Sequence, residues 1–205
     1  MYFFLSTDCI SEERGFYDTN TLLSASYTTL DGKYNTILSK SFILKPEGKL
    51  TKDTRKIIKS FNKVDETKFE YINKIELLKI IEYDLKSSKY LIANYNKHHR
   101  SLINSLSETY NDFFFNLTDI DILQISRSFA GIKMYKGNGN LLKTPSSIEV
   151  YYWLFKKKPK IINSHFTIGN LIECFTELNN RGLIPELHPS IDFTEELIKS
   201  KLKSY

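Results

Sequence analysis

The chain has 205 residues, of which 41% are hydrophobic, 14% aromatic and 26% charged, and its formal net charge is +5. This length predicts one domain with a sizeable core, and this composition excludes an intrinsically disordered chain. The positive charge and a sequence pI of about 9.0 favour anionic partners, although many proteins without a nucleic-acid role are as basic. Charge by itself therefore does not establish nucleic-acid binding.

The cysteine count and the start of the chain bear on the cellular setting. The two cysteines, Cys9 and Cys174, form no CxxC pair, which argues against a zinc site or a disulfide framework and favours a reducing, intracellular setting. The apolar start, residues 1–5, is short and has no basic leader, so it predicts a first strand rather than a signal peptide. No apolar run has the length needed to cross a membrane. We expect a cytoplasmic protein, or a virion-associated one if the source is viral, without a membrane partner.

The N-terminal part of the chain has the pattern of β-strands. Residues 2–5 form a continuous apolar run typical of a buried strand, and the polar residues 11–20 predict a loop. Residues 23–29 alternate up to an Asp-Gly pair, which is a hairpin-turn signal, and a second alternating segment covers residues 35–44. The sequence therefore predicts three antiparallel strands in this part.

Helical spacing dominates the rest of the chain. The predicted helices cover residues 51–61, 66–85, 98–110, 148–155, 167–181 and 192–203, and short strand candidates cover 90–93 and 121–126. Ser146 and Ser147 supply an N-cap, and Gly182 stands where a glycine commonly ends a helix. Helix 66–85 is expected to bury Ile72, Ile75, Leu78, Ile81 and Leu85. This order predicts an α/β fold with a mixed central sheet, an N-terminal antiparallel hairpin and helices packed on it.

Five segments in a fixed order indicate a family resemblance. They are FFLSTD at 3–8, FILKPEG at 42–48, TRKII at 54–58, LIAN at 91–94 and IECFTELNNRGLI at 172–184. In this order they resemble the DnaQ-like (DEDDh) 3′–5′ exonuclease family, whose ribonuclease H-like fold satisfies the predicted order of elements. The resemblance implies an exonuclease-like domain over residues 1–185 and a short basic C-terminal helix or tail over residues 186–205.

The resemblance implies a metal-dependent chemistry, but most of the residues that this chemistry needs are absent from the chain. In the family, two divalent ions held by four carboxylates activate a water, and a His acts as general base. Carried over residue by residue, the five positions are Ser6, Asp8, His98, Ile162 and Thr167. Only Asp8 is a carboxylate, and one carboxylate leaves two dications under-compensated, because Mg²⁺ and Mn²⁺ prefer hard oxygen ligands. The sequence predicts a degenerate site with no catalytic residue, no cofactor, and weak metal binding at Asp8 at best.

A rebuilt metal site is the alternative, and it alone would restore a requirement for Mg²⁺ or Mn²⁺. His165 and Asn170 have the family's five-residue offset if the third motif is shifted by three residues, but this shift disrupts the match of the following helix and adds no acid. Acids that could reach the site are Glu12, Glu13, Asp18, Asp112, Asp119 and Asp121. The simpler interpretation is that these are solvated loop acids.

Polar and basic residues near the expected cleft are candidates for contacts with single-stranded nucleic acid. They are Asn94, Asn96, His98, His99, Arg100, Lys156, Lys157, Lys158 and Lys160. A protonated histidine could contact a phosphate, and the lysine run could follow a phosphate backbone. The alternatives are asparagines that satisfy a turn, an exposed helix start and a solvated lysine run. The aromatic group Tyr151, Tyr152 and Trp153 could stack on bases, but this helical spacing is more typical of a core.

Together these features predict a catalytically inactive exonuclease-like protein, retained for nucleic-acid binding or as a subunit of a larger nucleoprotein assembly. One alternative is a structural or interaction protein of a viral or replication complex that does not bind nucleic acid. Another is an active metal-dependent 3′–5′ exonuclease with a rebuilt site. Salt-sensitive binding to single-stranded DNA separates the first two hypotheses, and manganese-dependent degradation that Asp8→Ala abolishes identifies the third.

Overall fold

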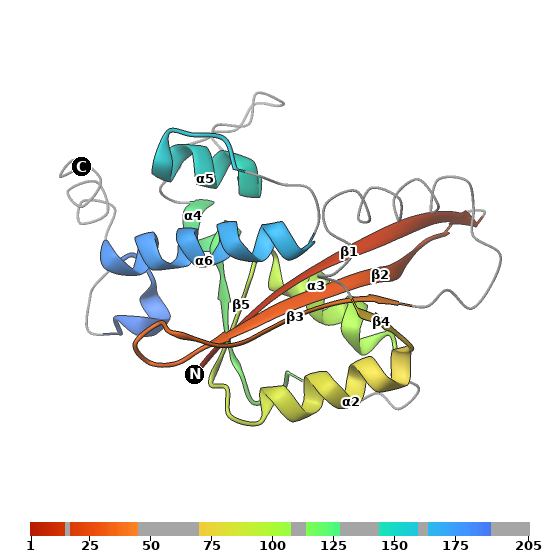
Figure 1. Cartoon of the computed structure of the whole chain (residues 1–205). Coiled ribbons are helices and arrows are strands. Elements are labelled where there is room, and N and C mark those ends of the chain that lie inside the picture. The colour runs from red at the N-terminus through yellow and green to blue at the C-terminus, as the bar shows by residue number, and fades with distance from the viewer. Residues whose placement is uncertain (15–16, 45–69, 108–113, 128–143, 160–163, 190–205) are drawn as a thin grey trace.

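A computed structural model of the chain describes residues 1–14, 17–44, 70–107, 114–127, 144–159 and 164–189 (Figure 1). The strands in these residues are β1 (Tyr2–Arg14), β2 (Tyr17–Leu30), β3 (Thr36–Leu44), β4 (Glu70–Ile72), β5 (Tyr90–Ala93) and β6 (Thr118–Asp121). They form one sheet in the order β4-β3-β2-β1-β5-β6. β1, β2 and β3 pair antiparallel, whereas β4 is parallel to β3, β5 to β1 and β6 to β5. The predicted mixed sheet with antiparallel N-terminal strands is confirmed.

Helices cover both faces of this sheet. They are α2 (Lys74–Leu85), α3 (Asn96–Asn104), α4 (Ile122–Arg127), α5 (Ser147–Phe155) and α6 (Ser164–Asn180), followed by the 3₁₀ helix η2 (Pro185–Leu187). Figure 1 shows α5 and α6 on one side of the sheet and α2 on the other. Ser146 caps α5 in a reciprocal capping box with Glu149, and Gly182, at φ 62°, follows the end of α6. Both helix-end predictions are confirmed. No described helix is long and apolar enough to cross a membrane.

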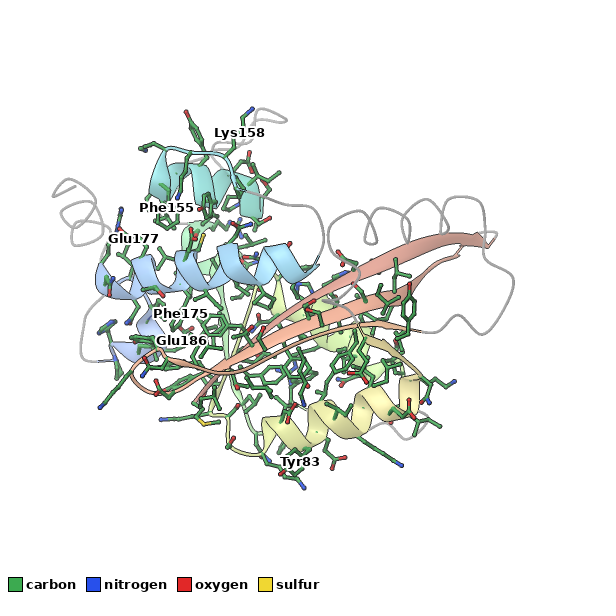
Figure 2. The ribbon with its side chains drawn as sticks, viewed as in Figure 1. Tyr83, Phe155, Lys158, Phe175, Glu177 and Glu186 are labelled. Atoms are coloured by element: carbon green, nitrogen blue, oxygen red, sulfur yellow. The ribbon has the colours of Figure 1, made fainter. Side chains whose placement is uncertain are left out.

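The core is divided by the sheet into two clusters. Because successive side chains of a strand point to opposite faces, Phe4 packs with α6, whereas Phe3 and Leu5 pack with the cluster that contains residues of α2 and α3. The rings of Phe4 and Phe175 meet edge to face at a centroid distance of 5.1 Å. Figure 2 shows Phe175 between α6 and the sheet. The same alternation assigns Ser6 and Asp8 to the α6 face of β1.

The predicted loop at residues 11–20 is wrong. Apart from residues 15–16, which lie outside the described part, these residues extend β1 and β2 as a ribbon. Residues 9–14 pair with residues 17–22, beyond the reach of the β1–β5 and β2–β3 pairs (Figure 1). The polar composition misled the prediction, because backbone pairing between two strands requires no apolar face.

The predicted helix 66–85 also differs from the structure. Its described part begins as strand β4 and becomes helical only after Asn73, which forms a reciprocal capping box with Glu76. Ile75, predicted to be buried, is 59% exposed. The buried residues of α2 are Leu77, Ile81 and Leu85. The predicted apolar stripe was therefore wrong at Ile75, because α2 buries the i, i+4, i+8 row that starts at Leu77, and a residue two positions before Leu77 lies on the other side of the helix.

The strand predicted at residues 121–126 is wrong too. The strand β6 ends at Asp121, and α4 begins immediately after it. The carboxylate of Asp121 accepts hydrogen bonds from the N–H groups of Leu123, at 3.0 Å, and Gln124, at 3.1 Å. This capping converts the apolar stretch into a helix. The helices predicted at 51–61 and 192–203 lie outside the described residues.

Candidate functional site

The site predicted from the sequence lies where β1 passes the carboxyl end of β5. Tyr2 to Phe4 of β1 pair in parallel with Tyr90 to Ile92, and β5 ends at Ala93. Asn94 and the residues after it therefore lie beside Ser6 and the residues that follow it on β1. Open α/β sheets bind ligands outside the carboxyl ends of their strands, so this edge is the candidate site.

On the α6 face of β1, the surviving acid is already engaged. Ser24 of β2 donates a hydrogen bond from its hydroxyl to Asp8 Oδ2 at 2.6 Å. Ser6 is buried, at 4% exposure, so its hydroxyl has little access to solvent. Thr167 is half-buried on α6, which packs on β1 and β2. Ile162 lies outside the described residues.

On the opposite face, His99 joins β1 to the end of β5. Its Nδ1 lies 2.7 Å from the Thr7 hydroxyl and its Nε2 lies 2.8 Å from the Asn94 carbonyl oxygen. Because a carbonyl only accepts, Nε2 carries the proton and Nδ1 accepts from Thr7. Burial lowers the pKa of His99 to about 4, helped by the neighbouring His98 and opposed by the Asn94 carbonyl. His99 is therefore a neutral, buried link between two strands rather than a cation for phosphate.

His98 contacts Cys9 and Tyr95. Its Nε2 lies 3.8 Å from Cys9 Sγ, and its ring is stacked with that of Tyr95 at a centroid distance of 6.2 Å and an interplanar angle of 16°. Alternation along β1 puts Cys9 on the α3 face, whereas Asp8 lies on the α6 face. Burial, followed by the charge of Asp8, raises the pKa of the Cys9 thiol, so this cysteine stays protonated and is not an activated nucleophile.

Two acids proposed for a rebuilt site have structural contacts. Asp121 accepts the N–H of Tyr95 at 3.2 Å and that of Asn96 at 3.0 Å, in addition to capping α4. Asp119 forms an ion pair with Arg100 in which the shortest distance is 2.6 Å. These acids therefore hold the α3 start in place instead of being simply solvated. The side chains of Glu12, Glu13 and Asp18, and the whole of Asp112, lie outside the described part of the chain.

The two asparagines of the turn differ in exposure. Asn96 is 3% exposed and donates from Nδ2 to the Leu91 carbonyl at 3.1 Å, so its buried side chain ties the start of α3 to the backbone of β5. Asn94 is half-buried, and its carbonyl is the acceptor for His99. A direct contact between the Asn96 side chain and a ligand would require this turn to open.

The lysine run follows α5. Lys156, at φ 55°, ends the helix, and Figure 2 shows Lys158 at the outer side of the molecule. All three lysines from 156 to 158 are exposed, and Lys157 Nζ lies over the rings of Tyr151 and Phe155 at 5.7 Å and 5.6 Å. Tyr151 itself is buried and belongs to the core, as its spacing indicated. Lys160 lies outside the described residues.

Solved structures share this architecture. No protein-family model matches the sequence, and no curated protein matches it. Escherichia coli Exonuclease I in complex with a dT13 oligonucleotide superposes with a TM-score of 0.61 at 12% identity, over 92% of this chain and 42% of that chain. Its complex with a dA16 oligonucleotide gives a TM-score of 0.60 at 13% identity, over 92% and 43%. The chain has an exonuclease-type, ribonuclease H-like fold.

A different protein also shares this fold. The Neurospora crassa Pan2 catalytic unit, with its protease and nuclease domain, has a TM-score of 0.50 at 10% identity, over 89% of this chain and 28% of that chain. The chain thus spans less than half of the length of each of these proteins.

The described residues of this exonuclease-like fold do not fit a pair of divalent ions. In that part of the chain, no group of three or more His, Cys, Asp or Glu side chains is arranged to hold a metal ion. On the α6 face of β1, just beyond its pairs with β5, the donors are one carboxylate that already accepts a hydroxyl and one buried serine. A two-metal centre needs several hard oxygen ligands around each ion, and this set does not supply them.

One residue of this edge was missed by the sequence analysis. Tyr95 has φ 71° and ψ 66°, a left-handed backbone that is uncommon outside glycine, and its side chain is 47% exposed. A signal was available, because Tyr95 stands between two asparagines directly after a buried strand. The sequence pattern drew attention to Asn94 and Asn96 as hydrogen-bonding residues, and Tyr95 between them was not named as a candidate.

Proposed function

We propose that this protein is a catalytically inactive exonuclease-like protein that binds single-stranded nucleic acid. The observation that carries the proposal is the donor set on the α6 face of β1. Asp8 is the one carboxylate among the five positions of the family, and its Oδ2 accepts a hydrogen bond from Ser24 at 2.6 Å. Cleavage by two metal ions depends on carboxylates that this set lacks.

Charge and fold support binding. The chain has a net charge of +5, and fewer acids at the site mean less repulsion of phosphates. Exonuclease I, which has the same fold, was solved with dT13 and with dA16 oligonucleotides, so this architecture is compatible with holding a single strand. In this proposal, exposed cations such as Lys97, Lys156 and Lys158 contact the phosphates.

The first test is a nuclease assay on 3′-labelled single-stranded DNA and RNA with Mg²⁺ or Mn²⁺. We expect no shortening by concentrated, folded protein, and no difference between the wild type and Asp8→Asn, which keeps an acceptor for Ser24. Metal-dependent shortening that a chelator and Asp8→Asn both abolish would show instead that the protein is an exonuclease with a rebuilt site.

The second test measures binding of short oligo-dT by fluorescence anisotropy over a range of salt. We expect log K to fall linearly with log salt, because binding releases counterions. The variant Lys156→Gln/Lys158→Gln should weaken binding more than Lys79→Gln/Lys86→Gln, which removes the same charge from α2 and the residue after it, on the opposite side of the sheet. Absence of binding at low salt would favour a docking role in an assembly instead.

A further inference from the structure

We propose that the stacked rings of Tyr95 and His98 form a platform for an unpaired nucleobase of a single-stranded nucleic acid. This inference rests on the proposed function and deepens it, because it names the group that the site takes and the side chains that take it. In the following, "the platform" means these two residues.

The platform is held rigid by its backbone. Left-handed backbone is unfavourable for a residue other than glycine, and it persists where the surrounding contacts hold it in place. Here the Tyr95 N–H donates to the Asp121 carboxylate at 3.2 Å, and the Tyr95 carbonyl accepts the His98 N–H at 3.1 Å. Among the exposed large apolar residues of the described ranges, Tyr95 alone has a positive φ. The backbone that carries the exposed ring is therefore held by hydrogen bonds on both sides of Tyr95.

The His98 ring of the platform is also in contact with neighbouring side chains. His98 is stacked with Tyr95 on one side, and its Nε2 lies 3.8 Å from Cys9 Sγ on β1. The ring of His99 meets His98 edge to face at a centroid distance of 5.6 Å. A base stacked on Tyr95 would extend an existing stack instead of ordering a mobile side chain, which lowers the entropy cost of binding.

The charges around the platform favour a base over a phosphate. The N–H groups of Tyr95 and Asn96, which open α3, both donate to the Asp121 carboxylate, so an anion at this helix start would meet a negative charge. Arg100 is paired with Asp119, and His99 is buried. A neutral, flat ring suits these surroundings, and the exposed Lys97 is available for the flanking phosphate.

The place of the platform supports the same ligand. Tyr95 follows the carboxyl end of β5, at the edge where open α/β sheets bind ligands. By contrast Tyr83, although 73% exposed, lies on the outer side of α2, as Figure 2 shows. Tyr83 therefore supplies a matched control that is exposed and aromatic but remote.

The test uses the full chain, short oligo-dT, and an abasic oligonucleotide of the same length that keeps the sugar-phosphate backbone. Tyr95→Asn removes the ring and tolerates the left-handed backbone, Tyr95→Phe keeps the ring, and Tyr83→Ala is the control. We expect Tyr95→Asn to bind oligo-dT about 5-fold to about 150-fold more weakly than the wild type, because that is the usual contribution of one base stacked on an aromatic side chain. We expect Tyr95→Phe and Tyr83→Ala to bind like the wild type and abasic binding to stay unchanged in all variants.

The outcomes separate the two proposals. If the wild type binds oligo-dT and Tyr95→Asn, folded by circular dichroism, binds it equally well, the platform is overturned and the proposed function stands. If Tyr95→Phe loses as much affinity as Tyr95→Asn, the hydroxyl and not the ring makes the contact, and stacking is overturned. If the wild type binds neither oligonucleotide at low salt, the proposed function fails and the platform fails with it.

Discussion

The two faces of β1 differ in what they do at the candidate edge. On the α6 face, Ser6 and Asp8 occupy positions where the family resemblance implies metal ligands, yet one is buried and the other accepts a hydroxyl from Ser24. On the α3 face, Thr7 and Cys9 contact two adjacent histidines, of which the resemblance singles out His98 but not His99. The two faces of one strand can therefore differ in role. The α6 face of β1 keeps the fold of the family without its metal ligands, whereas the α3 face makes the polar contacts to the histidines.

The largest expected effect is on the packing that holds the α6 face together. Phe175 is fully buried and contacts Phe4 and Tyr2, so Phe175→Ala should lower the free energy of unfolding by about 3–5 kcal/mol. Phe115→Ala, at an 81% exposed position, should change it by less than about 0.5 kcal/mol. Urea unfolding of both variants measures this difference, and similar values for the two would contradict the assigned core.

The next effect concerns the acids beside the α3 face. Asp121 accepts N–H groups at the starts of α3 and α4, so Asp121→Ala should cost about 2–3 kcal/mol through the loss of two caps. Asp119→Ala should cost about 0–1 kcal/mol, because the Asp119 side chain is 41% exposed and its ion pair with Arg100 is screened. Chemical denaturation measures both. Equal costs would show that Asp121 does not organise this turn.

The pH dependence of stability tests the burial of His99. The folded-state pKa of His99 is about 4, below its ordinary value of 6.5, so the fold favours the neutral ring. The stability from this preference is present above pH 6.5 and is lost as the pH falls toward about 4. His99→Gln should flatten the fall of the urea midpoint across this window, because it removes the group whose protonation the fold disfavours. If the urea midpoint of His99→Gln falls with pH as steeply as that of the wild type, His99 is not the group responsible for the pH dependence.

The smallest expected effect is that of divalent ions on the α6 face. A site with one engaged carboxylate should bind Mg²⁺ or Mn²⁺ so weakly that millimolar ion shifts the melting temperature of the wild type no more than that of Asp8→Ala. Differential scanning fluorimetry with matched ionic strength measures this. A rise with Mn²⁺ in the wild type that is absent in Asp8→Ala would restore the rebuilt-site hypothesis.

Much of the fold was predictable from local patterns. The apolar run from Tyr2 to Leu5, the alternating segments around the hairpin and the strand 90–93 appear where the pattern predicts them. The cap at Ser146 begins α5, and the glycine at 182 follows the end of α6, as expected. The failures at residues 11–20, at Ile75 and at residues 121–126 have a common cause. In each, a pairing partner or a capping side chain decided the conformation instead of local polarity.

The candidate site was less predictable than the fold. The resemblance identified Asp8 and His98 as members of one constellation, but alternation along β1 assigns Asp8 and the Cys9 contact of His98 to opposite faces. The nucleic-acid roles of the exposed lysines stay predictions. Burial of His99 and the pairing of Arg100 were not visible in the chain, because their partners Thr7 and Asp119 are distant in sequence.

The sequence by itself determined the strand and helix pattern, the single carboxylate among the family positions and the positive charge, because each is a property of residue type and spacing. Only the tertiary structure decided that Tyr95 has a left-handed backbone and stacks on His98. Its N–H is held by Asp121, 26 positions further along the chain, and His98 is held by Cys9, 89 positions before it. Contacts over such separations form when β1, β5 and β6 align in one sheet, and no local pattern encodes that alignment.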